Sequence, residues 1–167
     1  MKTITVNASK TYDVIIGEGL LAKTGQLTAE VVQPCKAAII TDDNVDALYS
    51  AQVDESLREA GFDTVKFVFP NGEESKNLTV FGQALNFLAE NRFSRSDLIV
   101  ALGGGVVGDL AGFVAAVFLR GIRFVQVPTT LLAAVDSSVG GKTAVDLDSG
   151  KNLAGCFCQP ERVINFI

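Results

Sequence analysis

The sequence predicts an α/β fold in which helices flank a mostly parallel β-sheet, preceded by an N-terminal β-hairpin. Short runs rich in β-branched residues alternate with longer runs whose apolar residues recur at helical spacing, in the order strand, helix, strand, helix, strand, helix, strand. Glycine, proline, aspartate or asparagine ends most of these runs, which is typical of turns. The chain has 167 residues, 48% of them hydrophobic, and this is enough to bury one core, so we expect a single domain.

The first predicted elements are a hairpin and a helix. Residues 3–6 and 12–16 cluster β-branched side chains on either side of a turn-like segment, residues 7–10, and this predicts two antiparallel strands. Residues 20–32 then place apolar side chains at helical spacing. We expect Gly25 to weaken this helix, because glycine loses more backbone freedom on folding than other residues do.

The middle of the chain predicts two strands and two helices in alternation. Residues 36–40 form a buried strand, and residues 45–57 carry apolar side chains on one helix face up to a stop signal at Gly61. Residues 65–69 form the next strand, which the sequence Pro-Asn-Gly ends. Residues 78–88 again place their large apolar side chains on one face, as an amphipathic helix does.

The last part of the chain begins with a strand and a buried helix, at residues 98–102 and 110–119. A strand at residues 124–127 and a helix-like run at residues 131–136 follow. The chain closes on a strand-like apolar segment, residues 163–167, without a polar tail. Because domains seldom stop at such a segment, we expect the chain to be truncated.

A glycine-rich segment joins the strand at residues 98–102 to the buried helix. Gly103, Gly105 and Gly108 have the G-x-G-x-x-G spacing that is typical of a nucleotide-binding turn. We attribute glycine here to a positive φ at the turn and to the lack of a Cβ, which would hold a diphosphate away from the N–H groups at the helix N-terminus. The alternative is a tight turn that only lets the helix pack on the sheet. The acidic residue that usually holds a ribose about 20 residues further on is missing.

Polar loops follow four of the predicted strands. These loops contain Asp42, Asp43 and Asn44, then residues 71–76, then residues 103–109, then Thr129 and Thr130. In parallel sheets ligands bind beyond the carboxyl ends of the strands, so we expect the four loops to lie on one rim. Asp42 or Asn44 could supply the missing ribose contact, with Glu73 as a competitor. Helix capping is the alternative for Asp42 and Asp43.

Composition and charge argue against several functional classes. The chain carries 14 Lys plus Arg against 19 Asp plus Glu and has no basic run, so we expect no nucleic-acid partner. Its longest apolar run, residues 110–119, is about half of a bilayer span, and the N-terminus lacks a signal sequence, so we expect a soluble cytoplasmic protein with no membrane partner. Three cysteines argue against a disulfide framework, and a chain without His cannot build the usual His-rich catalytic zinc sites.

Two lysines follow glycines late in the chain. Lys142 ends a segment similar to a Walker phosphate loop, but Asp136 stands where that motif needs glycine, so we reject the assignment. Lys151 follows Gly150. Either lysine could approach an anion as a point charge, and the alternative is a solvated surface side chain.

Several separated segments together resemble the 3-dehydroquinate synthase family. They are residues 71–76 (NGEESK), 102–109 (LGGGVVGD), 128–133 (PTTLLA), 136–143 (DSSVGGKT) and 150–152 (GKN). This ordered combination is far more specific than one glycine motif. The resemblance implies that residues 1–167 are the N-terminal, Rossmann-like NAD-binding domain of an enzyme. The helical C-terminal domain of that family, which binds zinc or cobalt through a Glu and two His, would be absent from this chain.

The resemblance also implies which residues bind the cofactor. They are Asp42, Asn44, Asn71, Gly72, Glu73, Glu74, Ser75, Lys76, Gly104, Gly105, Val106, Val107, Gly108, Asp109, Thr129, Thr130, Lys142 and Lys151. Among them, Asp42, Asn44, Glu73 and Lys76 would hold the adenosine side of NAD. The segment from Gly105 to Asp109 would approach the diphosphate.

The same resemblance assigns the catalytic residues. Asp136, Lys142 and Asn152 would face the substrate, and Arg120 would reach a phosphate in the neighbouring subunit of a homodimer. No metal ligand is assigned to this chain. Cys158 departs from the family, which has an aromatic residue or His at that position, and this leaves less packing area there.

The activity implied by the resemblance is the conversion of 3-deoxy-arabino-heptulosonate 7-phosphate to 3-dehydroquinate and phosphate. This lyase reaction belongs to the shikimate pathway to aromatic amino acids, and NAD serves in it as a transient redox cofactor. The alternatives are a related sugar-phosphate cyclase and a non-catalytic NAD-binding module. We expect the isolated chain to bind NAD and to be inactive.

Overall fold

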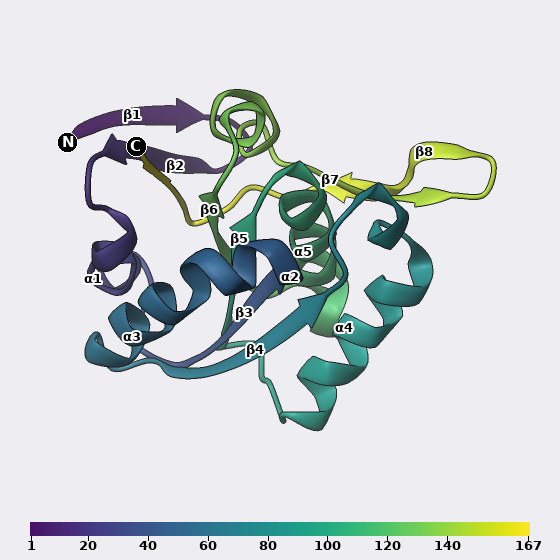
Figure 1. The fold of residues 1–167 in the computed structure, drawn as a ribbon, viewed down its shortest axis with the longest axis horizontal. Coiled ribbons are helices and arrows are strands. Elements are labelled where there is room, and N and C mark those ends of the chain that lie inside the picture. The colour runs from purple at the N-terminus through teal and green to yellow at the C-terminus, as the bar shows by residue number, and fades with distance from the viewer.

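The computed structural model describes residues 1–167 and shows a sheet of seven strands with helices on both faces (Figure 1). The strand order is β1-β2-β9-β6-β5-β3-β4. All neighbouring pairs are parallel except β1 and β2. The strands are β1 (Lys2–Asn7), β2 (Thr11–Gly17), β3 (Lys36–Asp42), β4 (Asp63–Phe69), β5 (Leu98–Gly103), β6 (Arg123–Pro128) and β9 (Arg162–Phe166). The predicted α/β fold, a parallel sheet with an N-terminal hairpin, is therefore confirmed.

The helices lie between the strands in the predicted order. They are α1 (Thr24–Ala29), α2 (Asp43–Val45), α3 (Ala51–Glu59), α4 (Leu78–Glu90) and α5 (Gly105–Val117). Shorter helical turns cover Leu21–Lys23, Asp46–Ser50, Glu73–Ser75, Phe118–Arg120 and Ala133–Ser137. None of these helices combines the length and the apolar character that crossing a bilayer requires.

The core has one apolar layer on each face of the sheet, because successive side chains of a strand point to opposite faces. The central strand β5 is buried along its whole length. Its residues Ile99 and Ala101 belong to the layer that contains α4 and α5, whereas Leu98, Val100 and Leu102 belong to the layer that contains α1 and α3. This two-sided burial explains the continuous apolar run of β5, and it fixes the glycine segment that follows.

The helix predicted at residues 20–32 is shorter than expected and starts with a 3₁₀ turn. Gly25 is not a weak point in it. A Cβ on Gly25 would lie 1.9 Å from the carbonyl oxygen of Ser56 in α3, and the Gly25 N–H donates to the Ser56 hydroxyl at 3.0 Å. Glycine is therefore required because α1 and α3 approach closely.

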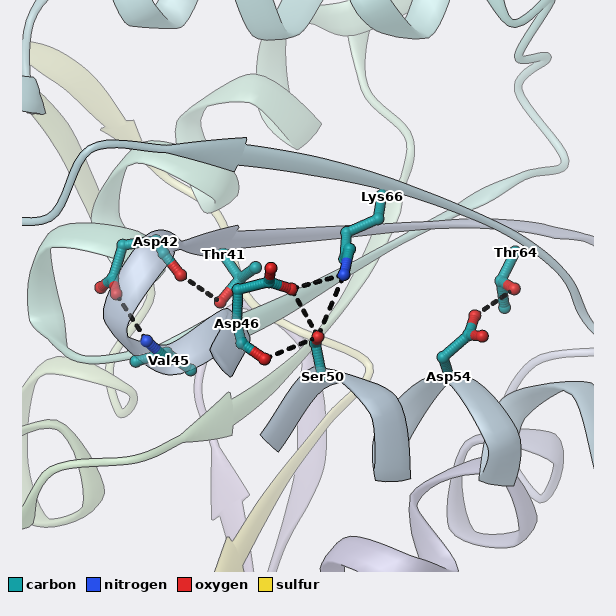
Figure 2. Close-up of polar contacts among 8 residues, drawn as sticks. All are labelled: Thr41, Asp42, Val45, Asp46, Ser50, Asp54, Thr64 and Lys66. Atoms are coloured by element: carbon teal, nitrogen blue, oxygen red, sulfur yellow. Dashed lines mark hydrogen bonds and ion pairs between the residues drawn. The ribbon is translucent and has the colours of Figure 1, made fainter. Parts of the chain in front are cut away.

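The helix predicted at residues 45–57 is instead three consecutive pieces: α2, a π-helical turn at Asp46–Ser50, and α3. Figure 2 shows the polar contacts that hold the π-helical turn against β4. The Asp46 carboxylate accepts from the Ser50 hydroxyl and lies 2.5 Å from the ammonium of Lys66, which also donates to Ser50 at 3.2 Å. The Ser50 hydroxyl lies 2.9 Å from the carbonyl oxygen of Asp46 as well. Such a side-chain bond competes with the regular helix ladder, and apolar periodicity alone does not reveal it.

An unpredicted second sheet lies beside α5. It is an antiparallel hairpin of β7 (Lys142–Leu147) and β8 (Gly150–Phe157), separate from the seven-stranded sheet (Figure 1). Val145 of β7 is fully buried in the core layer of α4 and α5, whereas most of β8 is exposed. The predicted C-terminal strand is confirmed as β9, which pairs with β2 and β6.

Candidate functional site

The loops after β3, β4, β5 and β6 meet at one edge of the sheet, as predicted. The register pairs Asp42 with Phe69 at the ends of β3 and β4, and Gly103 with Pro128 at the ends of β5 and β6. The N–H of Thr129 donates to the carbonyl oxygen of Gly103 at 3.0 Å. We call the edge formed by these four loops the rim.

A carboxylate joins two loops of the rim. Asp43 Oδ1 accepts from the side-chain amide of Asn71 at 2.7 Å and from its main-chain N–H at 2.9 Å. These hydrogen bonds, the side-chain one first, lower the pKa of Asp43. Asp43 therefore links the loop after β3 to the loop after β4, and the amide of Asn71 is already engaged in that link.

The physical reason for glycine in this segment differs from the predicted one. None of Gly103, Gly105 and Gly108 has a positive φ, so that part of the expectation is wrong. A Cβ on Gly103 would lie 2.4 Å from the side chain of Val107, and one on Gly108 would lie 2.7 Å from Gln126 Oε1. These two glycines are required by the packing of α5 on β5 and β6, which was the alternative interpretation.

Gly104 and Gly105 form the open part of the segment. Gly104 is the N-cap of the 13-residue helix α5, and its N-terminus has no side-chain cap hydrogen bond. A Cβ on Gly104 or Gly105 would meet only side-chain atoms, of Thr130 and Ser137, each at 3.2 Å. The first N–H groups of a helix lack partners inside the helix and attract anions. This end of α5 can therefore receive a phosphate group, to which the half-buried Val106 and the buried Val107 offer main-chain N–H groups.

The predicted ribose contacts differ in their availability. Asp42 caps α2 by accepting from the N–H of Val45 at 2.9 Å, which was the alternative interpretation. Asn44 is exposed on the rim. Glu73 lies 3.5 Å from the ammonium of Lys151 in β8, and a surface ion pair of this kind contributes only about 0–1 kcal/mol. Asn44 and Glu73 are therefore free to meet a ligand, whereas Asp42 already has a structural role.

Some of the remaining predicted rim residues shape the main chain, and others are accessible to solvent. Gly72 has φ 108°, in the left-handed region, and the buried Ser75 donates its hydroxyl to the carbonyl of Pro70 at 2.5 Å. Glu74 is exposed. After β6, Thr129 is half-buried, and the hydroxyl of Thr130 accepts from the N–H of Ala133 at 3.2 Å.

Lys76 occupies a position that the sequence does not suggest. Its residue is 4% exposed, and its ammonium lies 2.6 Å from Asp109 Oδ2 and 2.6 Å from Asn152 Oδ1. Burial raises the pKa of Asp109, and the neighbouring Lys76 ammonium opposes this shift. The resemblance places Lys76 on the adenosine side of NAD, and in the structure its ammonium lies between α5 and the β7–β8 hairpin.

A cavity of about 540 Å³ opens between α5, the helical turn at Ala133–Ser137 and the β7–β8 hairpin. Its lining brings together three of the predicted substrate residues, Asp136, Lys142 and Asn152, with Asp109. The Lys142 ammonium lies 2.9 Å from Asp136 Oδ1. The other lining residues were not among the predicted site residues; they are Ser137, Thr143, Ala144, Leu153, Gly155, Cys156 and Phe157. A register for the β7–β8 hairpin would have found most of them.

Arg120 does not reach this cavity. It follows α5 three residues before β6 begins, at the edge of the sheet opposite the rim, and it is exposed. Leu119 and Arg120 have φ of 51° and 66°, in the left-handed region that non-glycine residues seldom adopt. Its assignment to the site of a neighbouring subunit stays a prediction.

The two cysteines late in the chain differ in their exposure, and the chain's thiols and carboxylates form no metal-binding cluster. Cys156 is exposed at the cavity, whereas Cys158 is half-buried, and burial raises the pKa of the Cys158 thiol. Cys158 packs against the core layer of α4 and α5. No group of three or more Cys, Asp or Glu side chains is placed to hold a metal ion.

Comparison with known proteins identifies relatives of this chain. The family model described as 3-dehydroquinate synthase N-terminal matches residues 66–167. The 3-dehydroquinate synthase of Streptococcus suis is 56% identical over 162 residues, which are 96% of this chain and 46% of that protein. The 3-dehydroquinate synthase of Enterococcus faecalis is 51% identical over 164 residues, 98% of this chain and 46% of that protein. The chain thus spans about half the length of the curated relatives it matches.

Solved structures share the same fold. A 2-deoxy-scyllo-inosose synthase in complex with carbaglucose-6-phosphate, NAD+ and Co2+ has a TM-score of 0.90 and 30% identity, over 98% of this chain and 44% of that one. The 2-epi-5-epi-valiolone synthase of Streptomyces hygroscopicus, with NAD+ and Zn2+ bound, has a TM-score of 0.83 and 25% identity, over 98% and 45%. The family model covers more than half of the residues, and the fold and the sequence relatives agree with it. This chain therefore belongs to the 3-dehydroquinate synthase family, and it matches the N-terminal part of that family.

Proposed function

We propose that this chain is the NAD-binding part of a 3-dehydroquinate synthase, which converts 3-deoxy-arabino-heptulosonate 7-phosphate to 3-dehydroquinate and phosphate. The observation that carries the proposal is the cavity, which gathers Asp136, Lys142 and Asn152 beside α5 in a chain 51–56% identical to named 3-dehydroquinate synthases. We assign the protein to the cytoplasm on the same family basis.

The residues of the rim fit NAD. The uncapped N-terminus of α5 would receive the diphosphate at Gly104 and Gly105, where a Cβ would fill the approach. Asn44 and Glu73 would contact the adenosine side, with Asp42 holding the intervening turn. The two similar solved structures described above, which are 30% and 25% identical to this chain, contain NAD+, and this supports the same cofactor here. When bound, NAD would supply a hydride acceptor that takes a hydride from a substrate carbinol and later returns it.

The chain's own side chains would bind and orient the sugar phosphate. Lys142 is exposed at the cavity and would bind a substrate oxyanion through its ammonium. Asp136 and Asn152 offer a carboxylate and an amide to substrate hydroxyl groups. The cavity wall also includes the apolar side chains of Leu153 and Phe157, which a bound substrate would contact.

Two further assignments extend beyond one copy of this chain. We propose that the full enzyme is a homodimer and that Arg120 serves the site of the neighbouring subunit, which its position away from this chain's own cavity allows. Neighbouring structures contain Co2+ or Zn2+. Residues 1–167 do not offer a set of three metal ligands, so we assign none to this chain and derive no step through a metal.

Binding measurements on the 167-residue chain test the proposed substrate. With NAD present, 3-deoxy-arabino-heptulosonate 7-phosphate should bind more tightly than glucose 6-phosphate in a calorimetric titration. Tighter binding of glucose 6-phosphate would favour a related cyclase instead. Asp109→Ala should weaken NAD binding more than Asp43→Ala, because Asp109 lies in α5 close to the N-terminus that would receive the diphosphate, whereas Asp43 links two loops. Equal effects would remove Asp109 from the site.

Turnover separates binding from catalysis. We expect no release of phosphate from the heptulosonate phosphate by the purified chain with NAD and zinc supplied, because the chain offers no metal site. Turnover by this chain alone would contradict that part of the proposal. The gene sequence after Ile167 is a second test: a continuation with a Glu and two His at metal-ligand positions supports a complete synthase, and a stop codon there contradicts it.

A further inference from the structure

Lys76 connects three separate parts of the molecule. It follows the helical turn at Glu73–Ser75, and its ammonium bonds at 2.6 Å to Asp109 of α5 and at 2.6 Å to Asn152 of β8. Its carbonyl oxygen accepts from the N–H of Asp146 in β7 at 2.8 Å. One residue of the rim therefore contacts both the helix that begins at the glycine segment and both strands of the hairpin.

The position of the β7–β8 hairpin depends both on the packing of β7 against α5 and on polar contacts of this kind. It forms its own two-stranded sheet, and a lone hairpin of this size is only marginally stable in water. Val145 anchors β7 in the core, but most of β8 is exposed. Near the turn of the hairpin, Asn152 has φ 57°, and its N–H donates to Asp146 Oδ1 at 2.8 Å. The contacts of Lys76 with Asp146 and Asn152 thus fix the hairpin next to its turn.

The side chains of Lys76 and Asp109 are largely buried, and this makes the ion pair between them important for the structure. A salt bridge between Lys76 and Asp109, with side chains 5% and 16% exposed, is little screened by solvent. Removing one partner of a buried pair leaves the other charge uncompensated, which is strongly unfavourable. In contrast, Lys66 makes a comparable pair with Asp46, but its side chain is 41% exposed, and the pair joins β4 to the π-helical turn at Asp46–Ser50, outside the hairpin.

We propose that Lys76 is a positioning residue that holds the β7–β8 hairpin against α5 and thereby couples the substrate side of the cavity to the cofactor side. The hairpin carries Lys142 and Asn152, and α5 carries the N-terminus that would bind a phosphate. A shift of the hairpin therefore changes the distance from these two side chains to the N-terminus of α5. The positional role stands on the contacts alone, whereas the coupling of ligands rests on the proposed function.

Hydrogen exchange of the ligand-free chain tests the positional role. Lys76→Met should raise the exchange rates of the amides in residues 142–157 by about 10- to 100-fold relative to those of β5, because charged hydrogen bonds at the hairpin are lost. Lys66→Met is the matched control and should leave the hairpin rates unchanged. Unchanged hairpin rates in Lys76→Met would overturn the proposal.

A second variant covers the case in which Lys76→Met does not fold. Asn152→Gly removes the acceptor on the exposed hairpin and tolerates the positive φ. It should also raise hairpin exchange, and wild-type rates in this variant would overturn the role of the Lys76–Asn152 bond.

Linked binding tests the coupling. We expect NAD to raise the affinity of the wild-type chain for inorganic phosphate by about 5-fold or more, and Lys76→Met to bring this ratio close to one. The same ratio in both proteins would overturn the coupling. Failure of the wild type to bind NAD would count against the proposed function instead, and the exchange comparison would still decide whether Lys76 holds the hairpin.

Discussion

The ammonium of Lys142 lies 2.9 Å from the carboxylate of Asp136 at the cavity, and the two side chains are 54% and 60% exposed. Water screens such a pair, which stabilises the fold by only about 0–1 kcal/mol. The two groups can therefore separate at little cost when an anionic ligand arrives. This low cost is consistent with the proposed role of Lys142 and Asp136 as ligand-binding groups.

Lys142→Met should lower the affinity for inorganic phosphate in the presence of NAD by about 10- to 100-fold, since one charged hydrogen bond is lost. The free energy of unfolding should change by less than about 1 kcal/mol. Calorimetric titration and urea unfolding measure the two quantities. Lys23→Met, at an exposed lysine of the Leu21–Lys23 turn, is the control. Equal phosphate affinities in the two variants would remove Lys142 from the site.

Replacing two helical glycines by alanine should have opposite effects on stability. Gly25→Ala places a Cβ 1.9 Å from the carbonyl oxygen of Ser56, so the helices must separate, and we expect a loss of about 1–3 kcal/mol in the free energy of unfolding. Gly82→Ala lies in α4 with no atom within 4 Å of the new Cβ, and it should stabilise the chain by about 0.5–1 kcal/mol. Urea unfolding compares them. A Gly25→Ala protein as stable as the wild type would show that the helices are not packed this closely.

The contacts of Asp46 predict a pH dependence of stability. Hydrogen bonds from Lys66 first, and from Ser50, lower the pKa of Asp46 below its ordinary value of 3.8. A carboxyl whose pKa is lower in the folded state contributes stability above the unfolded pKa, and that contribution disappears as the pH falls through the folded pKa. Asp46→Asn should therefore cost about 1 kcal/mol at neutral pH and less below pH 3.8. Denaturant unfolding at several pH values checks this, and a cost that does not vary with pH would contradict it.

Much of the fold follows from local patterns in the sequence. The strand β5 is buried on both faces, so its continuous apolar run was sufficient to predict it. The position of the rim followed from topology, because loops after parallel strands meet at one edge. The π-helical turn at Asp46–Ser50 could not be predicted in this way, since it depends on contacts with Lys66 in β4.

The site was harder to predict than the fold. Lys76 belongs to a polar loop, where a lysine usually faces water, and its partners are 33 and 76 residues away in the sequence. The β7–β8 hairpin was missed because its position depends on α5, where a Cβ on Gly112 would lie 2.5 Å from the side chain of Thr143. The resemblance identified Asp136, Lys142 and Asn152 without this geometry, and the structure shows that one cavity contains them.

The proposed function requires that the rim binds NAD at the open end of α5. Calorimetric titration of the 167-residue chain with NAD measures this binding, with Gly105→Val as the variant and Gly82→Ala as the control. We predict measurable binding by the wild type and by Gly82→Ala, and a loss of about 10-fold or more in Gly105→Val, because its side chain occupies the path of the diphosphate. A flat wild-type titration at millimolar NAD, or equal affinities in all three proteins, would contradict the account.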